Sequence, residues 1–436
     1  MTFLETVRNK SFWFIDALRG HPIGKHYREI KTVLADYNSK EAKTIINNNL
    51  STLLKHASST TTFYKDYQGI NDINKFPIIS KILVKERYED FMSSTYKDKN
   101  NFKVSSSGST GIPFELYQNS EKRYRNVADS IVFAERAGVP IGIKVIIMSI
   151  WNIAKKKNFL LAWMQNVDMQ EVTDLNDEEV KRFLINLQKK SNYKGIWAYA
   201  SALDNLAHYL NTNNLDMSNA NVNAIVACSE KLDDNTKISL EKHLNTSVLS
   251  RYSNAESGIF AQKIVNGDST FFMNHGSYHF EILKFENDTP QEYGKPGRII
   301  LTDLLNHCMP LIRYDTGDVG TVVLNENNVP VFSKIEGRKQ DLIYNTKGEL
   351  ISSFAITNIM IGLTHIKQYQ FIQEDKTNYT LKVNAPYLEK DKVFFTSKLK
   401  ALLGDDANIT IEYIEEIPLL SSGKRQRVVS KYLKEV

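Results

Sequence analysis

The side chains best suited to bind phosphate lie in one short stretch, residues 104–114, with the sequence VSSSGSTGIPF. Successive backbone N–H groups in a Gly-rich turn can form an anion-binding nest, and Ser or Thr hydroxyls add further donors. The stretch does not match a P-loop, because its two glycines are too close together and Ile112 follows the second one. Taken alone, the stretch is better explained as a surface loop without a ligand. The candidate phosphate ligands are Ser106, Ser107, Gly108, Ser109, Thr110 and Gly111.

Three further stretches carry charged side chains beside turns. Glu256 follows an apolar run in RYSNAESG, Asp318 follows a Thr-Gly turn in IRYDTGD, and Lys424 follows a Ser-Ser-Gly turn in IPLLSSGKRQR. Each has a structural explanation when taken alone: a solvated carboxylate, a turn former and one of many exposed lysines. A functional interpretation therefore depends on their joint occurrence and their order along the chain.

The elements that must position these residues follow from the apolar pattern. Residues 1–100 show helical spacing, and from residue 144 onward strand-length apolar runs alternate with amphipathic stretches, as in a sheet covered by helices. Shorter strands separated by turns, between residues 276 and 336, predict an antiparallel β subdomain. The last hundred residues predict a hairpin, a helix, a strand, a second helix and a final strand at 408–417.

We therefore expect an α/β protein with two domains. The N-terminal core spans 1–337 and comprises a mainly helical part (1–100), an α/β part (101–275) and a β-barrel-like subdomain (276–337). A small mobile α+β domain spans 338–436, with a hinge near 338–341.

Composition narrows the class of protein. Hydrophobic residues make up 42% of the chain and charged residues 24%, so a disordered chain is excluded. The net charge of +5 is spread along the chain without an arginine-rich block, which argues against a nucleic-acid partner. Cys228 and Cys308 stand alone, so a disulfide framework and a CxxC metal site are both excluded. We expect a cytoplasmic protein.

The N-terminus contains NKSFWFIDALRG, whose apolar run is too short for a signal peptide and is interrupted by Asp16. No stretch approaches the roughly 20 apolar residues that a membrane-spanning helix needs. One interpretation is a peripheral membrane helix, but we favour a helix docked on its own domain. The residues that such a peripheral helix would use are Phe3, Leu4, Val7, Phe12, Phe14 and Ile15.

Together and in this order, the motifs resemble those of the adenylate-forming superfamily of acyl-CoA synthetases, adenylation domains and luciferases. SSGSTGIP resembles its phosphate loop, ACSEKL the segment lining adenine, RYSNAESG the magnesium-binding glutamate motif and RYDTGD the ribose-binding aspartate motif. EGRKQDLIYNTKGELI resembles the hinge with its following hairpin, and PLLSSGK the catalytic lysine motif. The resemblance spans residues 104–427. MPLIRYDTGDVG is similar to the phenylacetate-CoA ligase group, and YSNAESGIFAQ to its CapK-type branch, which is associated with capsular polysaccharide synthesis.

The resemblance implies that ATP activates a carboxylic acid as an acyl-adenylate and releases pyrophosphate. Because a carboxylate must approach the α-phosphate, two anions meet, and the site has to neutralise their charge. Mg²⁺ bound to Glu256 and a mobile Lys424 are the implied sources of positive charge. Asp318 and Arg338 would bind ribose. The residues implied to line the adenine and ribose are Ser229, Glu230, Lys231, Tyr252, Ser253, Asn254, Asp318 and Arg338.

Some positions depart from the family pattern. Gln340 stands at the hinge, where many relatives have Asp or Lys, and the phosphate loop lacks the lysine that often follows its second glycine. Some relatives carry a zinc-binding cysteine cluster. Two cysteines are too few for one, even though His307 adjoins Cys308, so we do not expect structural zinc.

The sequence defines the carboxylic acid and the acceptor of the acyl group less closely. Candidate acyl-pocket residues are Trp197, Tyr199, Ser201 and His279, with core packing as the alternative for each; Tyr252 is likewise either an adenine platform or a core residue. Gly348, at the tip of the hairpin, is implied to line a channel for the thiol acceptor. That acceptor could be CoA, a carrier-protein thiol or an amine on a sugar nucleotide or glycan.

The other class of function left open is a nucleotide-binding scaffold without turnover. The expected partners are ATP and a small carboxylic acid. We expect a monomer or homodimer, which could associate peripherally with a membrane-bound polysaccharide assembly system.

Overall fold

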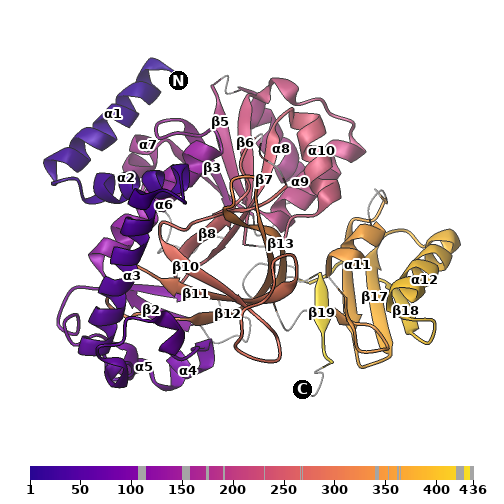
Figure 1. Ribbon diagram of the computed structural model, residues 1–436. Helices are drawn as coiled ribbons and strands as arrows, with labels where there is room; N and C mark the ends of the chain where they lie inside the picture. The colour runs from indigo at the N-terminus through magenta and orange to yellow at the C-terminus, as the bar shows by residue number, and fades with distance from the viewer. Residues whose placement is uncertain are drawn as a thin grey trace.

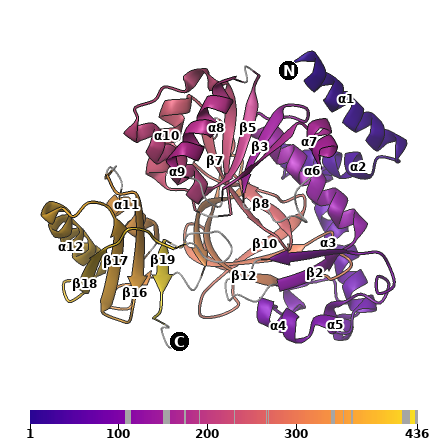
Figure 2. The same cartoon turned by 180° about the vertical axis from the view of Figure 1, so that it is seen from behind.

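A computed structural model of the chain, shown in Figure 1, has a large N-terminal domain built on a mainly parallel sheet and a small C-terminal domain beside it. The back view in Figure 2 shows the same arrangement of the two domains. The structure describes residues 1–436 except 107–113, 150–157, 173–175, 190–191, 230, 266, 268, 339–342, 352, 361–362, 364, 419–426 and 433–436.

The central sheet of the N-terminal domain has seven strands in the order β4-β3-β5-β6-β7-β8-β9. The first five run parallel and the last two pair antiparallel. The apolar runs that predicted strands from residue 144 onward form β3, β5, β6 and β7, so this part of the prediction is confirmed. The strands are β3 (Lys144–Ser149), β4 (Val167–Glu171), β5 (Lys194–Tyr199), β6 (Val222–Cys228), β7 (Ser247–Asn254), β8 (Gly258–Gln262) and β9 (Phe272–Met273).

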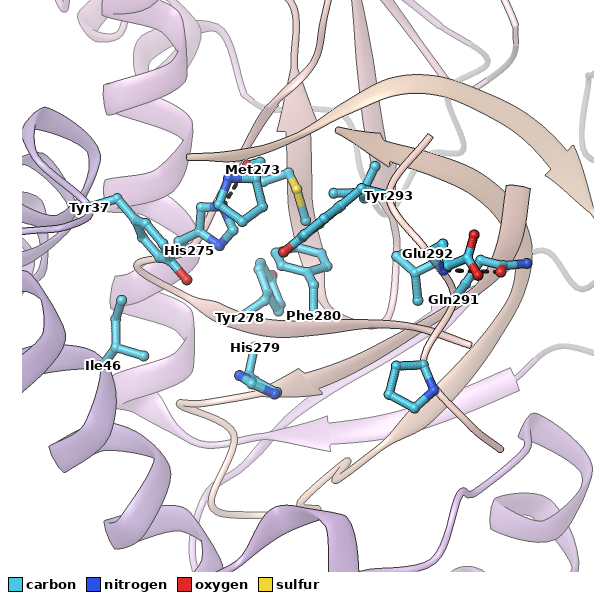
Figure 3. A pocket seen from close by; sticks show the side chains of 14 residues that line it. Tyr37, Ile46, Met273, His275, Tyr278, His279, Phe280, Gln291, Glu292 and Tyr293 are labelled. Atoms are coloured by element: carbon cyan, nitrogen blue, oxygen red, sulfur yellow. Dashed lines mark hydrogen bonds between the residues drawn. The ribbon is translucent and has the colours of Figure 1, made fainter. Parts of the chain in front are cut away.

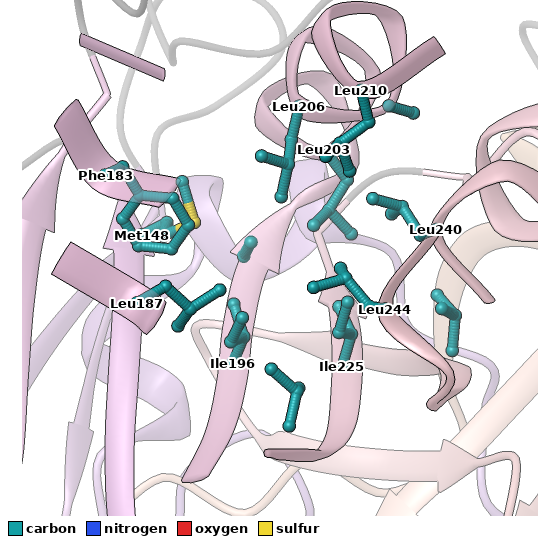
Figure 4. Close-up of a cluster of buried hydrophobic side chains, with 14 of the residues drawn as sticks. Met148, Phe183, Leu187, Ile196, Leu203, Leu206, Leu210, Ile225, Leu240 and Leu244 are labelled. Carbon is teal, nitrogen blue, oxygen red and sulfur yellow. The ribbon is translucent and has the colours of Figure 1, made fainter. Parts of the chain in front are cut away.

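Three amphipathic helices cover one face of this sheet: α8 (Asp177–Lys189), α9 (Ala200–Thr212) and α10 (Asp234–Leu244). Figure 4 shows their apolar side chains packed over those of the strands, with Leu203 and Leu240 above Ile225. Burying a side chain of this size stabilises the fold by about 1.5–3 kcal/mol. The cluster therefore holds the three helices against the face of the sheet that includes β5 and β6.

The first hundred residues are mainly helical. Thr2 and Glu5 form a capping box at the start of the first helix, which explains where it begins. The helices of this region are α1 (Phe3–Leu18), α2 (Pro22–Ala35), α3 (Lys40–Thr60), α4 (Lys81–Glu86) and α5 (Tyr88–Phe91). Further helices of this domain are α6 (Ser120–Arg136) and α7 (Phe159–Met164), with short 3-10 turns at Lys65–Tyr67, Ile73–Lys75 and Ser218–Ala220.

The predicted β subdomain is a four-stranded antiparallel sheet in the order β10-β11-β12-β13. Among the strands that the structure describes, no pairing between β10 and β13 closes it, so it is an open sheet and not the barrel-like form that we expected. A two-stranded ribbon, β1 with β2, lies on either side of residues 107–113. The strands are β1 (Phe102–Ser106), β2 (Phe114–Gln118), β10 (Tyr278–Leu283), β11 (Pro296–Asp303), β12 (Tyr314–Leu324) and β13 (Pro330–Arg338).

The C-terminal domain has its own four-stranded sheet, in the order β18-β17-β16-β19, and its own buried cluster. The strand predicted as the last one is β18, but β19 follows it and pairs with β16, so that prediction is wrong. The elements are β14 (Ile343–Tyr344), β15 (Leu350–Ile351), α11 (Ser353–Met360), β16 (Gln368–Gln373), β17 (Asn378–Asn384), α12 (Glu389–Leu403), β18 (Asn408–Tyr413) and β19 (Val428–Ser430).

Candidate functional site

The aspartate of the RYDTGD motif is held by a tyrosine from the central sheet. Asp318 lies on β12, and the Tyr252 hydroxyl at the end of β7 donates a hydrogen bond to its Oδ2 atom at 2.7 Å. Thr316 Oγ accepts from the Asp318 backbone N–H at 3.0 Å, which fixes the turn that presents the carboxylate. Burial, together with the charge of Asp318, raises the pKa of Tyr252 well above its ordinary value, so the phenol remains a donor.

The two residues implied to bind ribose lie on neighbouring strands. In the antiparallel register of β12 and β13, Asp318 is directly opposite Arg338. Side chains at such positions are about 5 Å apart at Cβ. The Arg338 side chain itself lies outside the described part of the structure. The backbone nevertheless places positions 318 and 338 opposite each other on neighbouring strands.

Glu256 occupies the turn between β7 and β8 and is only 7% exposed. The Tyr314 hydroxyl lies 3.4 Å from its Oε1 atom, and the Tyr314 ring is parallel to that of Phe114, with 6.4 Å between ring centroids. Phe114 is the first described residue after the predicted phosphate loop, and Gln118 donates to the Glu256 carbonyl at 2.8 Å. The structure thus brings Glu256 next to the strand on which that loop ends.

Asn254 shapes the turn that carries Glu256. Its Oδ1 atom accepts hydrogen bonds from the backbone N–H groups of Ser257 at 2.8 Å and Gly258 at 3.4 Å. The neighbouring Ser253 pairs with Ile259 in the ladder of β7 and β8. Asn254 therefore positions a motif residue, which the motif alone did not reveal.

The segment implied to line adenine follows the end of β6. Ser229 has a φ of +69°, in the left-handed region, so the chain turns sharply after the strand. Burial lowers the pKa of Lys231 to about 8, although the nearby Glu336 on β13 opposes the shift. Lys231 is therefore close to the strand that carries Arg338. Glu230 lies outside the described residues.

An arginine from the C-terminal domain reaches the N-terminal domain near the carboxyl ends of β5 and β6. The Arg427 guanidinium forms an ion pair with Asp204 on α9 and lies 3.5 Å from Asp233, the N-cap of α10. Asn235, also at the start of α10, donates to the Met360 carbonyl of α11 at 3.1 Å. Sequence alone does not distinguish Arg427 from the other basic residues near the C-terminus, so its contacts were not predicted.

The candidate acyl-pocket residues lie in two places. Trp197 packs in a buried cluster with Val139 and Leu249, and Tyr199 and Ser201 occupy the junction of β5 and α9. His279 instead lines a cavity of about 250 Å³ next to β10 (Figure 3), whose lining residues do not include Trp197. Burial lowers the pKa of His279, so its imidazole is uncharged at neutral pH.

The hairpin implied to face the thiol acceptor is formed by β14 and β15. Gly348 has a φ of +80° in the turn between them, and its N–H donates to the Asn345 carbonyl at 2.9 Å. Thr346 donates to Asp406 at 2.6 Å, so the turn is tied to the segment after α12.

The remaining predicted residues lie outside the described part of the chain, and so do the side chains of Ser106 and Arg338. Their positions in the site stay predictions. These residues are Ser107, Gly108, Ser109, Thr110, Gly111, Glu230, Gln340 and Lys424.

The fold is that of the adenylate-forming CoA ligases. The chain matches 2-hydroxyisobutyryl-CoA ligase in the postadenylation state, in complex with 2-HIB-AMP, with a TM-score of 0.71 at 14% identity over 90% of both chains. The thioesterification state of that ligase, with 2-HIB-AMP and CoA, gives 0.56 at 16% identity over 90% of both chains. ATP-bound MatB from Rhodopseudomonas palustris gives 0.56 at 14% identity, over 74% of this chain and 66% of MatB.

Sequence comparison identifies a narrower relationship. Residues 343–431 match the CapK C-terminal domain. The chain is also 24% identical to Protein CapK of Staphylococcus aureus over 382 residues, which cover 83% of this chain and 81% of CapK. The chain is therefore a distant homologue of CapK and carries the C-terminal domain of the CapK family. The predicted resemblance to adenylate-forming enzymes is confirmed for the fold, and the predicted resemblance to CapK is confirmed for the sequence.

Proposed function

We propose that this protein activates a carboxylic acid with ATP and then transfers the acyl group to CoA or another thiol, in the biosynthesis of a surface polysaccharide. The observation that carries the proposal is the pairing of Asp318 with Tyr252, opposite Arg338, beside the buried Glu256. These residues come from β7, β12, β13 and the turn before β8, and they occur in a fold shared with CoA ligases. The homology to CapK supports the role in polysaccharide synthesis.

In the first step, each of these residues and Lys424 would have its own task. Asp318 accepts hydrogen bonds from the ribose hydroxyls, while Tyr252 holds its carboxylate in place. In the reaction, a carboxylate oxygen of the acid bonds to the α-phosphorus of ATP and the bond to pyrophosphate breaks. Lys424 neutralises charge at the α-phosphate as this happens.

Glu256 suits a magnesium ion. Mg²⁺ prefers carboxylate and phosphate oxygens, and Glu256 offers a buried carboxylate with a phenol as its neighbour at 3.4 Å. When bound, the ion neutralises phosphate charge. Burial and the proximity of Glu256 raise the pKa of Tyr314, so its phenol stays neutral beside that carboxylate.

In the second step the sulfur of the thiol bonds to the acyl carbon and AMP leaves. The two steps need different groups at one site, and rotation of a small domain supplies them in turn. The higher TM-score with the postadenylation structure than with the thioesterification structure supports an arrangement of domains nearer to the first. We therefore assign 338–436 as the moving domain and Gly348 to its thiol-facing hairpin.

Exchange of pyrophosphate into ATP, measured with a panel of carboxylic acids, tests the first step. We expect acid-dependent exchange that falls about 100-fold or more in Lys424→Ala, because a charge facing the transition state is lost. Lys431→Ala is the matched control, since Lys431 pairs with Glu374 on the surface of the same domain. Absence of exchange with every acid contradicts the proposal and favours a scaffold, whereas full exchange by Lys424→Ala contradicts the role assigned to Lys424. Adding CoA and then amines, and weighing the products, identifies the acceptor.

A further inference from the structure

The first helix of the protein turns its apolar side outward. On α1, Phe3 is 86% exposed, Phe14 64% and Leu18 72%. At 3.6 residues per turn these three side chains fall within one arc of the helix, roughly 60° wide, and the full stripe spans roughly 120°. A helix of a globular protein normally turns such a stripe toward the core. The full stripe consists of Phe3, Leu4, Val7, Phe14, Ile15 and Leu18.

The side of α1 that faces the protein carries both of its acidic residues. Glu5 and Asp16 are both 3% exposed, whereas acidic side chains are normally solvated. Asp16 accepts hydrogen bonds from the N–H groups of Ile23 and Gly24 at the start of α2, each at 2.9 Å. Glu5 closes the capping box of α1 itself. The orientation of α1 is therefore fixed by hydrogen bonds made from its acidic side.

A second exposed apolar segment contacts α1. The Arg8 guanidinium donates to the Trp163 carbonyl of α7 at 3.2 Å and lies 5.3 Å from the centre of the Trp163 ring. The sequence of α7, FLLAWM, is wholly apolar, and Phe159 is 86% exposed. Figures 1 and 2 both show α1 and α7 at the same end of the N-terminal domain. We call the exposed apolar residues of these two helices the α1–α7 face.

The charged side chains that α1 and its C-cap present beside this face are positive. Both acidic residues of α1 are buried, so the charged side chains left at its surface are Arg8, Lys10 and Arg19. By helical geometry Lys10 lies beside one edge of the apolar arc, and Arg8 and Arg19 beside the other. Long basic side chains in such positions can extend toward lipid headgroups while their stems cover apolar surface.

We propose that the α1–α7 face docks on an anionic membrane surface, with its apolar side chains in the boundary between headgroups and acyl chains. An apolar stripe with basic borders has the chemistry of an interfacial helix. Of the helices that the structure describes, none is long and apolar enough to span a membrane. The C-terminal domain lies at the opposite end of the molecule (Figures 1 and 2), so docking leaves it free to move.

The structure thereby revises our expectation for the N-terminus. We favoured a helix docked on its own domain over a peripheral membrane helix. The helix is docked on its domain, through Asp16 and through Trp13, whose ring centroid lies 4.8 Å from that of Tyr27. It nevertheless exposes the apolar residues that a membrane surface would bind, except for the half-buried Phe12.

Flotation of the full chain with lipid vesicles tests the proposal without requiring any catalytic activity. We expect binding to phosphatidylglycerol-containing vesicles and much weaker binding to pure phosphatidylcholine, decreasing as salt rises. The double variant Phe3→Ser/Phe14→Ser should lose about 100-fold in partitioning, because each buried Phe contributes about tenfold. Lys10→Glu should weaken binding to anionic vesicles specifically. The matched control is Ile238→Ser, an equally exposed apolar residue on α10.

Three results would overturn the proposal. One is an absence of binding to anionic vesicles by a chain whose circular dichroism shows it to be folded. Another is light scattering that detects a dimer which the double variant abolishes, together with no vesicle binding; the α1–α7 face would then be covered by a second copy. Equal loss of binding in Ile238→Ser would also contradict the assignment of the face.

Discussion

Arg427 links the C-terminal domain to the N-terminal sheet, and its removal should impair one half-reaction more than the other. The side chains of Arg427 and Asp204 are 20% and 18% exposed, and that of Asp233 is 9% exposed. In burial, these pairs are intermediate between two classes. Surface ion pairs contribute up to about 1 kcal/mol, and disrupting a buried pair costs about 3–5 kcal/mol. We therefore expect Arg427→Ala to destabilise this arrangement of domains by about 2 kcal/mol, a factor of about 30 in its population.

The assay compares the two steps. Pyrophosphate exchange should fall about 30-fold in Arg427→Ala, whereas transfer from a supplied acyl-adenylate to the thiol should change by less than about threefold. Burial raises the pKa of Asp233 and Arg427 opposes that rise, so the variant also leaves this carboxyl less ionised. Lys431→Ala, which breaks an ion pair within the C-terminal domain, should alter neither rate. Equal losses in both steps, with an unchanged melting temperature, would refute the reasoning.

Two further predictions follow from buried side chains. Tyr252→Phe removes the donor to Asp318 and should weaken ATP binding by about tenfold in calorimetry, while Tyr193→Phe, at an exposed tyrosine, should leave it unchanged. Burial, reinforced by Arg125, lowers the pKa of His26 from 6.5 to about 3, so folding favours its neutral form. The stability that this contributes is complete above about pH 6.5 and is lost as the pH falls toward 3. Urea unfolding should show a loss of about 2 kcal/mol between pH 7 and pH 5 from this group. His26→Gln should flatten that slope; an unchanged slope would contradict the assignment.

The strands that the sequence predicted correctly share a clear signal. In β5 and β6, uninterrupted apolar runs of strand length precede amphipathic helices, and their buried side chains meet those of α9 and α10. By contrast, β19 has three residues, which is too short for any periodicity to show. It is a strand only because it pairs with β16, itself a polar-aromatic segment that we did not predict.

The candidate site also combines residues that lie in recognisable motifs with contacts that no motif reveals. Glu256 and Asp318 could be named as candidates because each lies in a compact motif whose residues are neighbours in sequence, and their roles stay predictions. Contacts between residues far apart in sequence could not be foreseen. Tyr314 is 58 residues from Glu256, and Arg427 is 223 residues from Asp204. Such pairings exist only once the sheets have formed and the two domains have met, so no local pattern encodes them.

The way the two domains meet bears on whether one of them can move. Each buried apolar cluster among the described residues belongs to a single domain, and that of the C-terminal domain runs from Ile343 to Val428. The contacts that cross between the domains include the ion pairs of Arg427 and the bond from Asn235 to Met360. Polar contacts exchange readily with water, whereas a shared apolar core would have to be exposed at every rotation. The interface is therefore suited to the domain movement that the proposed two-step reaction requires, and Arg427 can favour one position without locking it.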